Sequence, residues 1–132
     1  MSCRIFFDAS LIGIARVLES QDDGIVYPGH PEWPHSQDAP DEVWLQYVGE
    51  RDWWAILRDK RIRYRSPQRA ALEEYKVRAV VITTSRNLNV EENASLLLEF
   101  WDQLKESLDG PPSYMHLTRA GLKTMLEYDQ EP

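Results

Sequence analysis

The chain is poor in cysteine and has no long hydrophobic segment, and each scarcity excludes a class of protein. Cys3 is the single cysteine, so no disulfide can form within the chain. No apolar run approaches the roughly 20 residues that span a bilayer, which excludes a membrane-spanning protein. The opening residues, MSCRIFFDAS, lack the basic stretch and the apolar stretch of a signal peptide. We therefore expect a cytoplasmic protein that does not associate with membranes.

The composition is that of an ordinary globular protein. Hydrophobic residues make up 42% of the 132 positions and charged residues 28%, which excludes a disordered or fibrous chain. This length predicts one domain, covering residues 1–132. The net charge of −7 argues against a general polyanion-binding protein.

One segment has the opposite charge to the rest of the chain. Residues 58–69, RDKRIRYRSPQR, carry six basic residues and one acid, so a segment of net +5 stands in a remainder of −12. Such a segment is typical of a surface that follows a phosphate backbone, although a solvated surface is the alternative. If the segment is extended, alternate arginines share one face. The predicted RNA-binding residues are Arg58, Lys60, Arg61, Arg63 and Arg65.

Strand and helix patterns alternate along the chain. The predicted strands cover residues 3–7, 24–27, 53–58, 77–84 and 113–118, and the predicted helices cover 11–20, 40–51, 66–75, 89–110 and 119–126. Residues 28–40 contain four prolines and are predicted to form a loop. This alternation predicts an α/β fold, a three-layer α/β/α sandwich around a mainly parallel five-stranded sheet.

Acidic residues stand at the predicted carboxyl ends of strands, where ligands of such sheets bind. Asp8 follows the first strand, Asp59 follows the third, and Asp41 opens the second helix on its buried face. Three carboxylates in one cleft repel one another, and Mg²⁺ or Mn²⁺ relieves that repulsion. Asp38, the expected N-cap of the second helix, and Glu42 remain alternatives to Asp41. Hydroxyl groups end the fourth strand, at Thr83, Thr84 and Ser85.

Three segments together resemble the PIN-like nucleases, most closely the short VapC-type toxins of bacterial and archaeal toxin–antitoxin pairs. The segments are RIFFDASLIGIARVL, DAPDEVWLQYVGERDWWAILRDKRIR and AVVITTSRNLNVEE. The resemblance implies an endoribonuclease that uses Mg²⁺ or Mn²⁺, with Asp8, Asp41 and Asp59 as metal-binding and catalytic residues. It also implies RNA as substrate and an antitoxin protein as partner, and a homodimer stays open.

The resemblance is incomplete after the fourth strand. Many PIN domains carry a fourth acid there, whereas this chain reads TTSRNLN. We expect Thr83, or else Thr84 or Ser85, to hold a metal-bound water instead. A PIN-like module that binds without catalysis therefore remains an alternative. A receiver-like signalling domain is a weaker one, because the sequence has DAS where an acidic pair is expected after the first strand.

Overall fold

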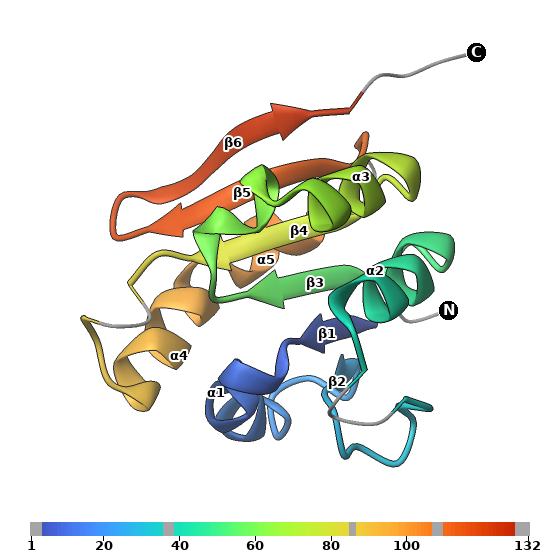
Figure 1. Cartoon of the computed structure of the whole chain (residues 1–132). Coiled ribbons are helices and arrows are strands. Elements are labelled where there is room, and N and C mark those ends of the chain that lie inside the picture. Colours follow the sequence, from blue (N-terminus) through green and yellow to red (C-terminus); the bar gives the residue numbers. More distant parts are fainter. Residues whose placement is uncertain (1–3, 36–38, 85–86, 107–109, 129–132) are drawn as a thin grey trace.

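The computed structural model describes residues 4–35, 39–84, 87–106 and 110–128, and a single sheet runs through this part of the chain. Its strands lie in the order β2-β1-β3-β4-β5-β6, and all neighbours are parallel except β5 and β6 (Figure 1). The strands are β1 (Ile5–Phe7), β2 (Ile25–Val26), β3 (Trp54–Leu57), β4 (Arg78–Ile82), β5 (Ser113–Thr118) and β6 (Gly121–Glu127). The mainly parallel α/β prediction is confirmed.

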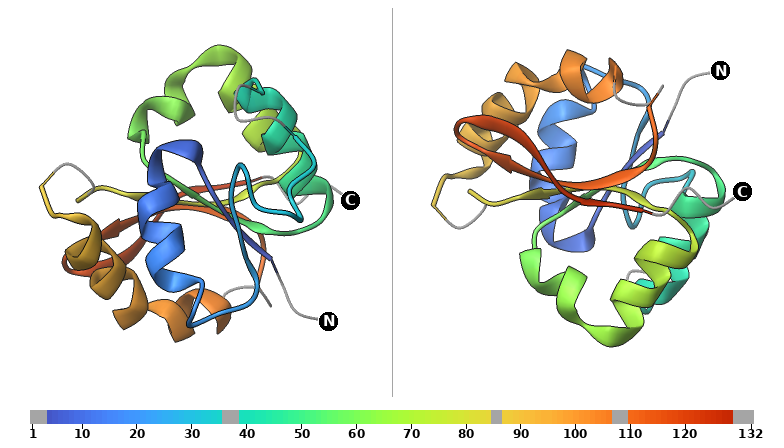
Figure 2. Two further views of the ribbon diagram at one scale, coloured as in Figure 1. Left: turned by 90° about the horizontal axis from the view of Figure 1, so that it is seen from below. Right: turned by 90° about the horizontal axis from the view of Figure 1, so that it is seen from above.

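Helices cover both faces of the sheet. The α-helices are α1 (Ile12–Leu18), α2 (Asp41–Glu50), α3 (Ser66–Glu74), α4 (Val90–Glu99) and α5 (Trp101–Glu106), and two 3₁₀ helices are η1 (Ala9–Leu11) and η2 (Lys60–Tyr64). Helices α1, α4 and α5 lie on one face, and α2 and α3 lie on the other (Figure 2). The described residues therefore form the three layers that the sequence predicts.

Strands β1 and β3 are apolar at every position, and β4 is apolar after Arg78, because both faces of these strands are buried. In β3, Trp54 and Ile56 pack in the core with α1, α4 and α5, whereas Ala55 and Leu57 pack in the core with α2 and α3. Side chains that alternate between two buried faces produce a continuous hydrophobic run. Such a strand offers no place for a charged side chain until it ends.

The proline-rich loop is anchored beside β1. Trp33 is only 7% exposed, and its ring stacks on Phe6 with the ring centroids 4.2 Å apart. Phe6 also contacts Trp44 of α2, at 5.2 Å between centroids. This aromatic contact fixes the loop and the start of α2 near the carboxyl end of β1.

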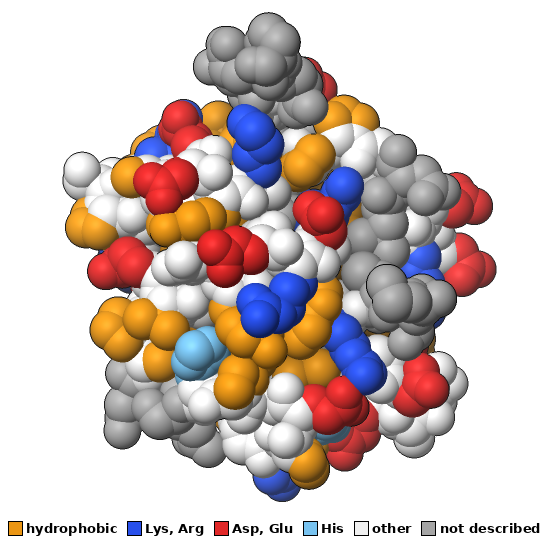
Figure 3. Space-filling model, turned by 90° about the vertical axis from the view of Figure 1, so that its right-hand side faces the viewer, with side chains coloured by type: hydrophobic (Ala, Val, Ile, Leu, Met, Phe, Trp, Pro, Cys, Tyr) orange, Lys and Arg blue, Asp and Glu red, His pale blue; other side chains and the backbone are white. Residues whose placement is uncertain are grey.

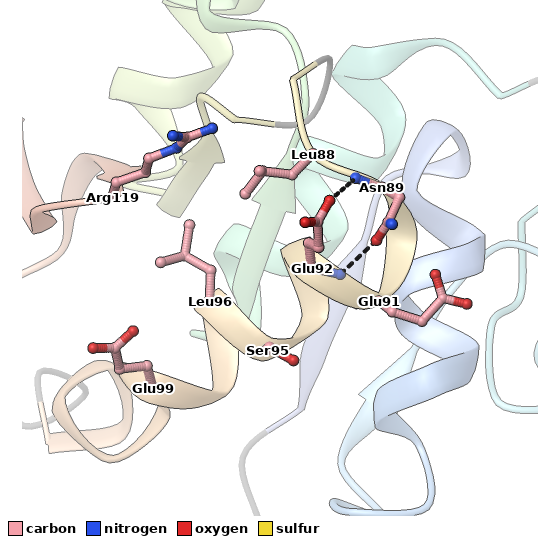
Figure 4. Close-up of a pocket in the computed structure, with 8 residues that line it drawn as sticks. All are labelled: Leu88, Asn89, Glu91, Glu92, Ser95, Leu96, Glu99 and Arg119. Carbon is pink, nitrogen blue, oxygen red and sulfur yellow. Dashed lines mark hydrogen bonds between the residues drawn. The ribbon is translucent and has the colours of Figure 1, made fainter.

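The predicted helix over residues 89–110 is divided in two. Asn89 caps α4, since its side chain accepts from the Glu92 backbone N–H while the Glu92 carboxylate accepts from the Asn89 backbone N–H (Figure 4). Phe100, with φ −108° and ψ 13°, interrupts the helix before α5. Leu97 and Trp101 are nevertheless both buried in the same core.

The prediction of a helix over residues 119–126 is wrong. Residues Gly121–Glu127 form β6, which pairs antiparallel with β5 and makes six strands in the described sheet. Gly121 has φ 125°, a conformation that favours glycine and begins the strand after a tight turn. Ala, Leu, Lys and Met favour helices by themselves, but pairing with β5 overrides that preference.

Candidate functional site

The carboxyl ends of the parallel strands form the left-hand edge of the sheet in Figure 1, and the predicted acids follow these ends or open α2. Strands β1 and β3 are neighbours in register, with Phe7 opposite Ile56. Asp8 follows β1 directly, and its backbone N–H donates to the Ile56 carbonyl at 3.0 Å. Asp59 comes two residues after the end of β3. The sheet thus brings both residues to one edge.

Asp8 is held in place by Ser10. Its Oδ1 accepts from the Ser10 backbone N–H at 3.3 Å, and its Oδ2 accepts from the Ser10 hydroxyl at 3.1 Å. Burial raises the pKa of Asp8, and the negative charge of Asp41 raises it further, although the Ser10 hydrogen bonds act in the opposite direction. A carboxylate in these surroundings is stabilised by a nearby positive charge.

Asp41 faces the same small pocket as Asp8. It is the first residue of α2, and its Oδ1 accepts from the Trp44 indole N–H at 3.0 Å. The pocket has a volume of about 50 Å³. Its walls are formed by Phe6, Asp8, Ala9, Pro28, Trp33, Ala39, Asp41 and Trp44.

Glu42, one of the two alternatives to Asp41, does not share this position. Glu42 is exposed and is not part of the pocket wall. Asp38 lies outside the described residues, and the N-cap of α2 is Pro40 rather than Asp38. The prediction that Asp38 caps this helix is therefore wrong, because the helix begins only one residue after Pro40.

Asp59 is bound by its own basic segment. Its Oδ1 accepts from the Arg61 backbone N–H at 2.9 Å and from Arg61 Nε at 3.2 Å, and its Oδ2 lies 2.8 Å from a terminal nitrogen of Arg65. Partial burial opposes ionisation of Asp59, but the Arg61 hydrogen bonds and both positive charges outweigh it and lower the pKa. Asp59 is therefore ionised and neutralised by two arginines.

The basic segment is not extended. Residues Lys60–Tyr64 form the 3₁₀ helix η2, so Arg61, Arg63 and Arg65 do not share one face by simple alternation. Arg63 lies over the Tyr64 ring, with its guanidinium carbon 4.7 Å from the centroid. The Lys60 side chain lies outside what the structure describes.

The hydroxyl groups after β4 have structural partners. The Thr83 hydroxyl donates to the Leu117 carbonyl at 2.9 Å, which ties the end of β4 to β5. The Thr84 hydroxyl donates to Asn93 Oδ1 at 2.8 Å. Ser85 lies outside the described residues.

Asn93 is a residue that the sequence interpretation missed. It is 2% exposed, and its amide nitrogen donates to the Leu88 carbonyl at 3.0 Å. Its signal in the sequence is a polar residue on the same helical face as Ala94 and Leu97, which are both buried. A buried amide on an apolar face needs polar partners, and here Thr84 is one of them.

The carboxylates of the acid pocket suit a hard divalent cation that takes few of its ligands from the protein. Among the described residues, no group of three or more His, Cys, Asp or Glu side chains is close enough to hold an ion. Two carboxylates, Asp8 and Asp41, nevertheless share one pocket. Mg²⁺ commonly binds to only one or two protein carboxylates and keeps several waters or takes substrate phosphates. The residues of this pocket therefore fit such an ion.

Other surfaces of the described chain have a different character. A cavity of about 470 Å³ beside α4 is lined by Glu91, Glu92, Glu99 and Arg119 among others, and by none of the predicted site residues (Figure 4). The face at the amino ends of the parallel strands mixes acidic, basic and hydrophobic side chains without a large area of one charge (Figure 3). Neither surface places an acid pair beside a cluster of arginines.

The fold and this edge define an α/β/α protein with acidic residues at the carboxyl ends of a mainly parallel sheet. A family model described as the PIN like domain matches residues 3–84, more than half of the chain, and the protein belongs to this PIN-like domain family. The match extends from β1 to the end of β4 and includes Asp8, Asp41, Asp59 and Thr83. No curated protein and no solved structure matches the chain. Each helix in the described part is too short or too polar to cross a lipid bilayer.

Proposed function

We propose that the protein is a metal-dependent endoribonuclease. The observation that supports this most is the pair Asp8 and Asp41 in one pocket, at the strand edge that also carries the arginine-rich segment. Membership of the PIN-like family supports a nuclease and a hydrolase at the level of the family. An acid pair for a cation beside a basic surface for phosphates is a combination suited to metal-assisted phosphodiester cleavage.

Each part of the chain has a separate task in this proposal. Asp8 and Asp41 would hold Mg²⁺ or Mn²⁺, which would supply an activated water and offset negative charge on the phosphate under attack. Trp44 orients Asp41, and Ser10 orients Asp8. Asp59 is the third acid of the site, available when RNA phosphates replace it as the partner of Arg61 and Arg65. Thr83 remains a predicted water-orienting residue.

The biological setting that we infer is a toxin of a type II toxin–antitoxin pair, with RNA as substrate and an antitoxin protein as partner. The support is the resemblance of three segments of this chain to VapC-type toxins. These segments contain Asp8, Asp41 and Asp59. Inducible expression tests this setting directly. The wild type should stop growth and degrade RNA, and Asp8→Asn should do neither.

The test of the catalytic proposal is single-turnover cleavage of a model RNA with Mn²⁺. Asp8→Asn keeps the size of the side chain and removes its charge, so it should stay folded and lose nearly all cleavage. Asp41→Asn should behave alike, and the double variant should be little worse than either single variant because the residues share one ion. Asp102→Asn on α5 removes the same charge outside the pocket and should cleave at the wild-type rate. Folded Asp8→Asn with wild-type cleavage would refute the proposal.

A second candidate is a PIN-like module that binds RNA without cutting it. The observation in its favour is Asp59, whose two oxygens are both occupied by arginine side chains. This candidate predicts RNA binding that is equal with Mn²⁺ and with EDTA, and intact RNA in both. The endoribonuclease predicts cleavage products only with Mn²⁺.

A further inference from the structure

A cavity separate from the acid pocket lies beside Ser10, the residue that hydrogen-bonds to Asp8. It has a volume of about 370 Å³ and lies between η1, α1 and the start of α4. Its wall includes Ser10, whose hydroxyl donates to Asp8. The complete lining is Ser10, Leu11, Gly13, Ile14, Arg58, Leu88, Asn89, Val90 and Asn93.

Arg58 gives this cavity a positive charge that is not neutralised in the described part of the chain. Arg61 and Arg65 pair with Asp59, and Arg69 pairs with Glu73. Arg58 is exposed, and no described residue forms an ion pair or a side-chain hydrogen bond with it. An unpaired guanidinium presents several parallel donors, which match the oxygens of a phosphate group.

Asn93 adds a fixed hydrogen-bond donor. The Thr84 hydroxyl donates to its amide oxygen, and its amide nitrogen donates to the Leu88 carbonyl, so the orientation of the amide is determined. The amide nitrogen carries two hydrogens, and the second has no acceptor among the described residues. Because Asn93 lines the cavity and is 2% exposed, an acceptor on a ligand would satisfy a donor that is otherwise costly to bury.

Apart from Ser10 and Asn89, the rest of the wall is apolar or glycine. Leu11, Ile14, Leu88 and Val90 contribute hydrophobic surface. Gly13 contributes no side chain, and a Cβ there would lie 3.4 Å from a Val90 methyl carbon, an ordinary contact. Alanine therefore fits at position 13, whereas a larger side chain has to extend into the cavity.

We propose that this cavity binds one nucleotide of single-stranded RNA, next to the phosphate that the acid pocket holds. Arg58 binds the nucleotide's phosphate, Asn93 donates to a base or ribose oxygen or nitrogen, and the apolar wall packs against the base. A volume near 370 Å³ is at the small end of ligand pockets and suits one nucleotide rather than a duplex. This inference rests on the proposed RNA-cleaving function and adds to it a site that selects the neighbouring base.

The test uses the full chain in EDTA, so that binding is measured without cleavage. The probes are the four ribonucleoside 5′-monophosphates and the matching nucleosides, with binding followed by nuclear magnetic resonance titration. At least one monophosphate should bind more tightly than the others and at least fivefold more tightly than its nucleoside. Arg58→Gln should remove that advantage of the phosphate, while Arg119→Gln, on the β5–β6 turn, should retain it.

Two further variants separate this proposal from the catalytic one. Gly13→Leu should abolish monophosphate binding, and Gly13→Ala should change it less than twofold. Asp8→Asn should still bind the monophosphate even though it no longer cleaves RNA. If Arg58→Gln, an exposed change that leaves folding intact, binds every monophosphate as the wild type does, the nucleotide site is wrong even when cleavage is observed. Selective binding by a chain that never cleaves RNA would support the site and overturn the catalytic proposal.

Discussion

The ion pair between Asp59 and Arg65 allows a prediction with opposite effects on two ligands. The pair joins Arg65 and Asp59 at 2.8 Å, with side chains 44% and 34% exposed. Exposed pairs of this kind contribute about 0.2–1 kcal/mol, so Arg65→Gln should lower the free energy of unfolding by less than about 1 kcal/mol. The same energy opposes transfer of the Asp59 carboxylate to a cation. Its removal should raise Mn²⁺ affinity by up to about fivefold, because about 1.4 kcal/mol corresponds to a factor of ten.

Calorimetric titration measures the affinity of Arg65→Gln for Mn²⁺. Fluorescence anisotropy with a single-stranded RNA in EDTA measures its affinity for RNA. RNA affinity should fall, and the slope of log K against log salt should become shallower by about 0.7 for the lost phosphate contact. Lys105→Gln is the matched control, because it removes one positive charge from an ion pair with Asp22, which is not one of the predicted acids. Equal Mn²⁺ affinity in wild type, Arg65→Gln and Lys105→Gln would show that Asp59 does not contribute to the metal site.

Three further predictions concern folding and metal binding. Burial and the charge of Asp41 raise the pKa of Asp8, so ionised Asp8 destabilises the metal-free fold. The Asp8→Asn protein should therefore have a higher melting temperature than wild type at neutral pH in EDTA. The difference in melting temperature should vanish below the ordinary pKa of 3.8, because folded and unfolded chains both carry protonated Asp8 there. A difference in melting temperature that stays constant across pH would contradict this prediction. Trp44→Phe keeps a ring against Phe6 but loses the donor to Asp41, and calorimetry should show about tenfold weaker Mn²⁺ binding rather than unchanged binding. Gly49→Ala places a Cβ 2.6 Å from Tyr75 Cβ, and urea unfolding should show a loss of about 1–3 kcal/mol from overpacking, not a wild-type midpoint.

The parallel part of the fold was predictable because its signal is local. Strands β1 and β3, and β4 after Arg78, are short apolar runs that end abruptly, and a run of this kind fits a strand buried on both faces. The position of Asp8 follows from the same signal, since the first polar residue after β1 has to lie at the carboxyl edge. Sequence also placed Asp41 on the buried side of α2, where it contacts Trp44.

The last strand and the division of the long helix were not predictable in this way. The segment RAGLKTML has the composition of a helix, and only pairing with β5 makes it a strand. Phe100, where the helix breaks, packs against the start of the same hairpin, since a Cβ at Gly121 would lie 3.3 Å from its ring. Pairing with β5 decides the strand, and a local pattern contains no information about that contact.

The ion pairs that Asp59 forms with Arg61 and Arg65 were not predicted from the sequence. Its place after β3 predicted a metal ligand, and the two basic residues Arg61 and Arg65 predicted a phosphate-binding surface. In three dimensions these are one ion-pair cluster, since each partner satisfies the other when no ligand is present. A cation that binds Asp59 releases the arginines, and a phosphate that binds the arginines releases Asp59. Because such coupling is reciprocal at equilibrium, RNA and metal should each strengthen the binding of the other. The proposed metal ligand Asp59 and the proposed phosphate-binding arginines thus stay paired with each other until substrate and ion bind together.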